Sequence, residues 1–176
     1  EETSNSLKKI FDTSICKVDC GGTFLIKPPG KGSFLGVHQD SPIIDERKYY
    51  AIYVWIPLCD MHKKNGTLKV LPGSHLWGNY HRSRFLPWTF RKQTKFISKL
   101  MKPIYVKEGD IICFDSAMIH ASNTNETSTT RVAISAAVLP KEYNIIHYFR
   151  DKTTPSGKVE KYIVDENFFL SEDVSE

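Results

Sequence analysis

The sequence predicts a mainly β protein, an antiparallel sandwich or barrel of the jelly-roll type. Short runs of β-branched and aromatic residues recur along the chain, and Gly- and Pro-rich turns separate them. Helical spacing is confined to short stretches, so the strands must supply most of the core. With 176 residues, of which 40% are hydrophobic, the chain is long enough to bury the core of one domain.

We expect residues 1–176 to form a single domain, with a core from about 23 to 140 and a C-terminal hairpin and acidic tail over 141–176. No run approaches the ~18 apolar residues of a spanning helix, and the N-terminus lacks the features of a signal peptide. A cytoplasmic protein without a membrane partner is therefore expected, and nothing in the sequence specifies an oligomeric state. The four cysteines are too scattered for a disulfide scaffold, so we expect reduced and mostly buried thiols.

The first part of the chain predicts a short helix and three strands. Leu7, Ile10 and Phe11 are spaced for one or two turns of amphipathic helix, and the strands are expected at 23–26, 34–38 and 49–56. The last of these is the clearest. Its alternation places Tyr53 and Trp55 on one face, opposite an aliphatic face of Ile52, Val54 and Ile56. We expect the aliphatic face to pack in a dry core and the Tyr and Trp face to line a pocket.

The second part of the chain predicts further strands around one long excursion. The strands are expected at 67–71, 103–106, 111–114 and 131–139, followed by a hairpin of 145–149 and 159–164. The excursion, roughly residues 77–102, is basic and contains one expected helix. Excursions of this length are uncommon inside compact domains and tend to form lids or binding loops.

A candidate metal site begins with His38 and Asp40, at the end of the predicted strand 34–38. Residues i and i+2 of a strand point to the same face, so an imidazole nitrogen and a carboxylate oxygen would lie side by side. His120, beyond the buried run 111–114, is the best third candidate. Two histidines and one carboxylate form the facial triad of non-haem Fe(II) oxygenases. The alternatives are a surface strand end for the pair and a satisfied core histidine for His120.

Arg131 opens the predicted strand 131–139, eleven residues after His120. If its side chain points inward, Ala133, Ser135 and Ala137 share its face. These small residues would leave space in front of the guanidinium. A cavity is therefore expected at this position.

Charge is distributed unevenly along the chain. Residues 61–107 contain eleven Lys and Arg and no Asp or Glu, whereas the rest has 13 basic and 20 acidic residues. Three interpretations are open: a solvated surface, a site for an anionic small substrate such as a CoA thioester or phosphate-bearing metabolite, or a nucleic-acid surface. Arg82, Arg84, Trp88, Arg91 and Lys92 interleave charge and aromatics as single-strand binders do, but the absence of a recognition motif argues against nucleic acid.

Several motifs in a fixed order give the chain a family resemblance. They are His38-Gln39-Asp40, Val54-Trp55-Ile56-Pro57-Leu58, Asn65-Gly66-Thr67-Leu68, Pro72-Gly73-Ser74-His75, Glu108-Gly109-Asp110 and His120-Ala121-Ser122, followed by Asn125 and Arg131. From about Lys27 to Pro140, this order resembles the phytanoyl-CoA dioxygenase (PhyH) family. The resemblance implies a double-stranded β-helix, the cupin-like form of the jelly roll, with a few short helices and a long basic insertion.

The resemblance also implies cofactors and residue roles. Fe(II), the cosubstrate 2-oxoglutarate and O2 would be used, with His38, Asp40 and His120 as iron ligands and catalytic centre. Arg131 would pair with the distal carboxylate of 2-oxoglutarate, and Ser122 would hydrogen-bond the same group. Trp55 matches an aromatic residue near the cosubstrate. A planar guanidinium at the back of a pocket suits bidentate recognition of a carboxylate.

The implied activity is hydroxylation of a small organic substrate, with conversion of 2-oxoglutarate to succinate and CO2. The family acts on acyl-CoA thioesters, amino acids, osmolytes and natural-product intermediates, so the resemblance does not specify the substrate. Members usually have a longer N-terminal portion, which we expect to be missing or shortened here. The competing interpretations are a catalytically silent jelly roll that serves as a metal or 2-oxoglutarate sensor or scaffold, and an oxygenase directed to nucleic acid.

Overall fold

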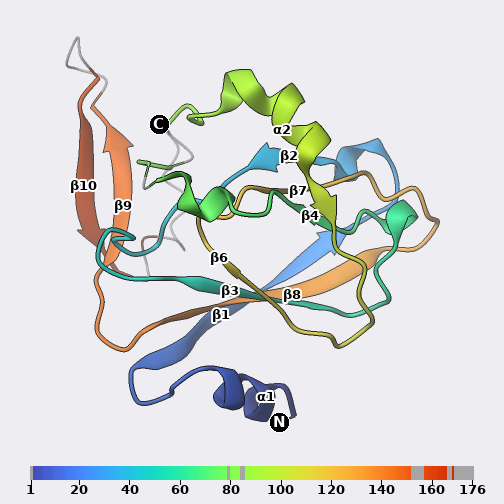
Figure 1. Cartoon of the computed structure of the whole chain (residues 1–176), viewed down its shortest axis with the longest axis horizontal. Helices are drawn as coiled ribbons and strands as arrows, with labels where there is room; N and C mark the ends of the chain where they lie inside the picture. The colour runs from blue at the N-terminus through green and yellow to red at the C-terminus, as the bar shows by residue number, and fades with distance from the viewer. Residues whose placement is uncertain (1, 79, 84–85, 152–156, 166–167, 169–176) are drawn as a thin grey trace.

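The computed structural model describes residues 2–78, 80–83, 86–151, 157–165 and 168 (Figure 1). The expected acidic tail lies outside these residues. In the described part, three antiparallel sheets hold the strands. The first sheet has the order β1 (Cys16–Lys27), β8 (Arg131–Pro140), β3 (Ile52–Pro57) and β6 (Ile112–Asp115). The second has the order β2 (Leu35–His38), β7 (His120–Ser122), β4 (Leu68–Val70) and β5 (Lys102–Pro103). The third is the hairpin of β9 (Ile145–Arg150) and β10 (Val159–Val164).

The prediction of a mainly β jelly roll is confirmed, and its strand limits change in three places. The strand expected at 49–56 begins three residues later, at Ile52. The strand expected at 23–26 is the end of the longer β1, because β8 continues to pair with it as far as Cys16 opposite Pro140. The strand expected at 103–106 shortens to β5. Beyond β5, Ile104 and Val106 turn into the apolar cluster around Trp55 and Leu68.

Short helices complete the described structure. They are α1 (Glu2–Ile10), α2 (Thr94–Leu100) and the 3-10 turns Lys31–Ser33, Lys63–Asn65, Ser74–Trp77 and Arg91–Gln93. Helix α1 lies beneath the first sheet (Figure 1), where Leu7 packs against Val54 and Val138. On the aliphatic face of β3, Val54 is therefore buried as its alternation predicts, whereas Ile52 and Ile56 are only partly buried.

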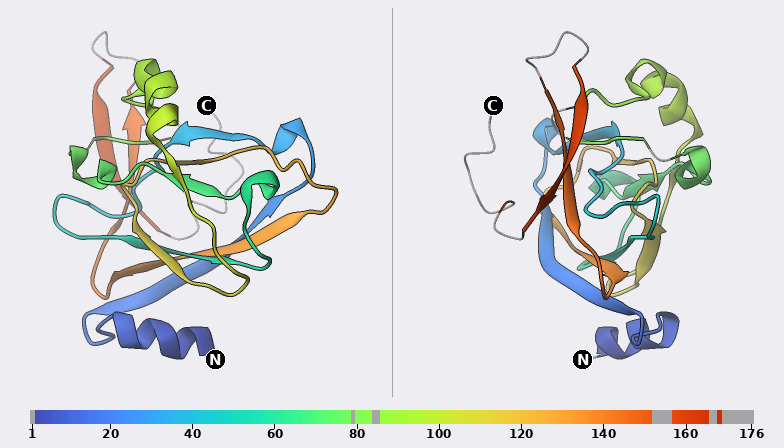
Figure 2. Two further views of the ribbon diagram at one scale, coloured as in Figure 1. Left: turned by 45° about the vertical axis from the view of Figure 1, so that its right-hand side comes forward. Right: turned by 90° about the vertical axis from the view of Figure 1, so that its left-hand side faces the viewer.

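The long excursion connects β4 to β5 and covers the second sheet. Helix α2 lies on the opposite side of the molecule from α1 (Figure 2). Its Ile97 packs with Leu71, Met101 and Ile119, and Trp88 packs against the same cluster. The expected single helix is thus α2, and apolar contacts fix the excursion to the sheet that carries β2 and β7.

The loop between β7 and β8 is held in part by the buried side-chain amide of Asn125. Its Nδ2 donates to the carbonyls of Lys27 and Thr129, at 3.0 and 2.8 Å. Gly66 lies against this loop with φ +70°, and a Cβ there would stand 2.5 Å from the carbonyl oxygen of Asn123. Glycine is therefore required, because a side chain would meet rigid backbone in a left-handed conformation.

Surface properties partly correct the expectations from composition. Of the cations in residues 61–107 that the structure describes, only Arg82 is buried, so a solvated surface accounts for most of this charge.

The expectation of mostly buried thiols is wrong for Cys113, which is exposed because it lies on the outer side of β6 at the edge of the first sheet. Cys16 and Cys59 are half-buried. No helix among the described residues has the length and apolar character needed to cross a membrane.

Candidate metal centre

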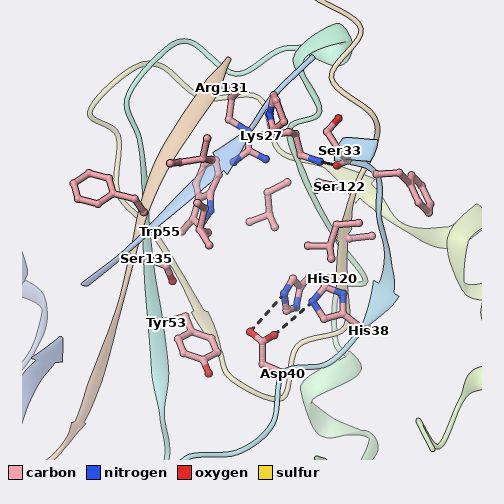
Figure 3. Close-up of a pocket in the computed structure, with 18 of the residues that line it drawn as sticks. Lys27, Ser33, His38, Asp40, Tyr53, Trp55, His120, Ser122, Arg131 and Ser135 are labelled. Atoms are coloured by element: carbon pink, nitrogen blue, oxygen red, sulfur yellow. Dashed lines mark hydrogen bonds and ion pairs between the residues drawn. The ribbon is translucent and has the colours of Figure 1, made fainter. Parts of the chain in front are cut away.

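His38, Asp40 and His120 converge at one point between the two larger sheets. His38 and His120 are directly opposite each other in the β2–β7 pairing, with ring centroids 4.2 Å apart. Asp40 lies just beyond β2, and its two carboxylate oxygens are 3.5 Å from Nε2 of His38 and 3.6 Å from Nε2 of His120 (Figure 3). One ligand atom from each residue lies within 4.8 Å of the others, a spacing that a single metal ion can bridge.

Backbone carbonyls fix the orientation of both imidazole rings. Nδ1 of His38 lies 2.8 Å from the Gly36 carbonyl oxygen, and Nδ1 of His120 lies 3.0 Å from that of Met118. A carbonyl oxygen only accepts, so each Nδ1 carries a proton, and Nε2 is the nitrogen that faces Asp40 and can ligate a metal once it is deprotonated. A ring nitrogen held by a backbone carbonyl is typical of metal-ligating histidines.

Electrostatics at the centre favour a deprotonated carboxylate. Burial alone would raise the pKa of Asp40, but the hydrogen bond with His38 and the positive charges nearby lower it. Burial would lower the pKa of His38, yet the hydrogen bonds to Asp40 and to the Gly36 carbonyl raise it. The pKa of His120 is lowered, chiefly by burial. Asp40 is thus ready to ligate a cation, and protons compete with the metal mainly at His38.

A cavity of about 510 Å³ extends from these ligands between the two sheets. His38, Asp40 and His120 lie at one end and Arg131 at the other, with Trp55 and Ser122 on the walls (Figure 3). Its mouth is apolar, formed by the exposed side chains of Phe24, Leu25, Ile26, Phe34 and Leu35. The six residues expected at the site from the sequence therefore line one cavity.

Arg131 is buried and incompletely paired at the far end of this cavity. Its Nη2 donates to the Gly66 carbonyl at 3.2 Å, and its Nε is buried without a hydrogen-bond partner. The guanidinium lies over the Trp55 ring, 5.5 Å from its centroid. Burial lowers the pKa of Arg131, so its charged form is held at a cost that a bound anion would offset. Ser135, from the same face of β8, leaves the space in front of it open.

Lys27 is a second cation in the cavity that sequence reasoning missed. Its Nζ donates to the carbonyls of Ser33 and Asn123, and only 6% of the residue is exposed. Burial first, and the nearby Arg131 second, lower the pKa of Lys27 to about 8. A signal was present in its position, because this lysine ends the apolar run 24–26 directly before a Pro-Pro-Gly turn.

Comparison with known proteins places this site in a family. The sequence model described as phytanoyl-CoA dioxygenase (PhyH) matches residues 1–133, about three quarters of the chain. The chain belongs to the phytanoyl-CoA dioxygenase family. The resemblance seen in the motifs is thereby confirmed.

Similar proteins include phytanoyl-CoA dioxygenases from a plant and from human. Phytanoyl-CoA dioxygenase 1 of Oryza sativa subsp. japonica is 29% identical over 122 residues, covering 68% of this chain and 43% of the rice protein. Peroxisomal phytanoyl-CoA dioxygenase of Homo sapiens is 26% identical over 162 residues, covering 81% of this chain and 44% of the human protein. The chain thus spans less than half the length of both relatives.

Similarity to solved structures establishes the fold of this member of the phytanoyl-CoA dioxygenase family. The nickel complex of the non-heme monooxygenase ThoJ matches with a TM-score of 0.59 at 22% identity, covering 88% of this chain and 58% of ThoJ. The epimerase SnoN, in complex with Fe3+, alpha-ketoglutarate and nogalamycin RO, matches with a TM-score of 0.59 at 18% identity, covering 74% of this chain and 52% of SnoN. The expected double-stranded β-helix is confirmed.

Proposed function

We propose that the protein is an Fe(II)- and 2-oxoglutarate-dependent dioxygenase that hydroxylates a small organic substrate. One observation carries the proposal: a His-Asp-His cluster and an incompletely paired arginine occupy opposite ends of one cavity. The balanced reaction converts a substrate C–H bond, O2 and 2-oxoglutarate into a C–OH bond, succinate and CO2. Family membership supports this reaction class.

The donor set suits iron. Two neutral imidazole nitrogens and one carboxylate are the facial triad of non-haem Fe(II) oxygenases, which leaves further positions for other ligands. His38 and His120 would each use Nε2, because Nδ1 is bound to a backbone carbonyl. Asp40 would supply one carboxylate oxygen. Bound iron would supply the site for O2 activation.

The cavity suits 2-oxoglutarate, a molecule with a carboxylate at each end. Arg131 would bind the carboxylate far from the iron, giving its buried Nε an acceptor. Ser122, buried on the cavity wall, would donate its hydroxyl to the same group. Trp55 would hold the guanidinium from one side, since the cation already lies over its ring. Lys27 would add a second positive charge at this end.

The relatives give independent support for this ligand set. The structure of SnoN contains Fe3+ and alpha-ketoglutarate, and that of HygX contains nickel, 2-oxoglutarate and hygromycin B. Both share the fold of this chain. A small molecule is therefore the substrate class that we propose here.

Succinate formation tests the proposal. The chain is reconstituted with Fe(II) under anaerobic conditions, then supplied with 2-oxoglutarate and O2, alone and with a panel of small metabolites. We expect succinate above the level given by the His120→Ala variant, because that variant lacks one of the three candidate iron ligands. Metal binding without any succinate would favour a catalytically silent binding module.

A further inference from the structure

A second cavity adjoins the metal centre on the side of the long excursion. Its volume is about 250 Å³, and His38 and Asp40 belong to its wall as they do to that of the larger cavity. The remaining wall includes Ser41, Arg82, Leu86, Pro87, Trp88 and Thr89. Arg131, Ser122 and Trp55 do not line it. The two cavities therefore meet at the candidate metal ligands and have different walls elsewhere.

Hydrogen bonds couple the wall of this smaller cavity to the ligand loop. Nε of Arg82 donates to the Asp40 carbonyl at 2.8 Å, and Nε1 of Trp88 donates to Oε1 of Gln39 at 3.3 Å. Gln39 is itself anchored, because its Nε2 donates to the Ala117 carbonyl at 2.6 Å. A group bound against this wall would consequently be held at a fixed place relative to His38 and Asp40.

The positive charge of Arg82, on the wall of this cavity, is balanced by a carboxylate of the protein. Arg82 is buried and forms a bidentate pair with Glu46, with Nη2 at 2.6 and 2.8 Å from the two carboxylate oxygens. Ser116 donates to the same carboxylate at 2.5 Å. What remains is the Nη1 of Arg82, which is buried without a hydrogen-bond partner. Arg82 is the only Lys or Arg among the described residues that line this cavity, so its wall offers an unused donor on a cation that is already neutralised.

Resting on the proposed function, we propose that the smaller cavity binds the reacting part of the substrate, and that this part is neutral and mainly apolar with one carbonyl or hydroxyl oxygen. That oxygen would accept from Nη1 of Arg82, which relieves the cost of a buried unpaired donor. Leu86, Pro87 and Trp88 supply apolar contact. The volume, below the ~300 Å³ typical of ligand pockets, requires a compact group.

A carboxylate or phosphate does not fit this cavity. A second anion beside Arg82 would approach Glu46, which already neutralises the guanidinium. Among the described basic side chains of the excursion, Arg91, Lys92 and Lys95 are exposed and do not line the cavity, so they give no compensation. This substrate class differs from the anionic one that the basic segment suggested.

Amide NMR shifts with two matched probes test the proposal. Cyclohexanone and cyclohexanecarboxylate have the same ring and differ in charge, and each is titrated into the ¹⁵N-labelled chain, both metal-free and with Zn(II) and 2-oxoglutarate. We expect cyclohexanone to shift the amides of residues 81–83, 86, 88 and 89, and to bind at least about fivefold more tightly than the carboxylate. Tighter binding of the carboxylate would overturn the proposal.

A leucine-to-tryptophan substitution in each cavity shows which of the two cavities binds cyclohexanone. Leu86→Trp fills the smaller cavity and should weaken cyclohexanone at least about tenfold, whereas Leu35→Trp, at the mouth of the larger cavity, should leave its affinity unchanged. Shifts confined to residues 24–27 and 33–35, or loss of binding in Leu35→Trp alone, would place the probe in the larger cavity and contradict the proposal. If Zn(II) causes no shifts at His38 and His120 while cyclohexanone still binds, the proposed metal site is refuted and the proposed ligand of the smaller cavity is not.

Discussion

The two cavities share His38 and Asp40 but treat their buried arginines in opposite ways. In the larger cavity, Arg131 has no carboxylate partner among the described residues. In the smaller cavity, Arg82 is neutralised by the carboxylate of Glu46. A buried cation without an anion favours an anionic ligand, whereas a neutralised one with a spare N–H favours a neutral acceptor. The comparison assigns the dianionic cosubstrate to the larger cavity and a neutral group to the smaller.

Replacing the shared metal centre should have the largest effect. His120→Ala removes one of three ligands and should weaken Mn(II) binding at least about 100-fold, measured by electron paramagnetic resonance of free Mn(II). His62→Asn is the matched control, because His62 is exposed and asparagine can still cap the turn that follows it. Equal metal affinity in His120→Ala and the control would contradict the assignment of His120 as a metal ligand.

The ion pair of the smaller cavity should rank next. Arg82→Met leaves Glu46 buried without its cation and should lower the free energy of unfolding by about 3 kcal/mol. The double variant Arg82→Met/Glu46→Gln should recover most of this loss, because no uncompensated charge remains. Urea denaturation measures both. A single variant as stable as the wild type would show that the pair does not fix the excursion.

Lys27 should give a smaller, pH-dependent effect in the larger cavity. Burial and the nearby Arg131 lower its pKa to about 8, so the cation is lost as pH rises through that value. The affinity for 2-oxoglutarate should therefore fall about threefold to tenfold between about pH 7 and pH 9. Calorimetric titration of the Mn(II)-loaded chain measures this change. A Lys27→Met variant with the same pH dependence would assign it to another group.

The lowered pKa of Lys27 also has a consequence for folding. Between about 8 and the ordinary lysine value of 10.5, the unfolded chain retains a proton that the folded chain has lost. The contribution of Lys27 to the free energy of unfolding should therefore increase with pH over this interval. Urea denaturation of the wild type and Lys27→Met across this interval isolates that contribution, and a constant difference between them would contradict the shift.

The features that depend on local spacing could be predicted from the sequence. The i, i+2 relation of His38 and Asp40 and the alternation that turns Arg131 inward are properties of single strands. The β2–β7 pairing then brings His120 opposite His38, although they lie far apart in the chain. The family motifs supplied that long-range link, because spacing alone does not specify which strands pair.

Arg82 shows what a single sequence does not contain. It is one of eleven Lys and Arg in a segment without acidic residues, so nothing local distinguishes it from the exposed cations around it. Its partner Glu46 comes from the loop after the ligand pair, outside that segment. Only the folding of the excursion onto this loop reveals that Arg82 is buried and that a second cavity exists.

The affinity for 2-oxoglutarate in two variants tests the division of the cavities most directly. Arg131→Met and Leu86→Trp are each loaded with Mn(II) and titrated calorimetrically with 2-oxoglutarate in the absence of O2. We predict a loss of about tenfold to a hundredfold in Arg131→Met with metal binding retained, and no change in Leu86→Trp. Equal losses in both variants, or loss of Mn(II) from Arg131→Met, would contradict the account.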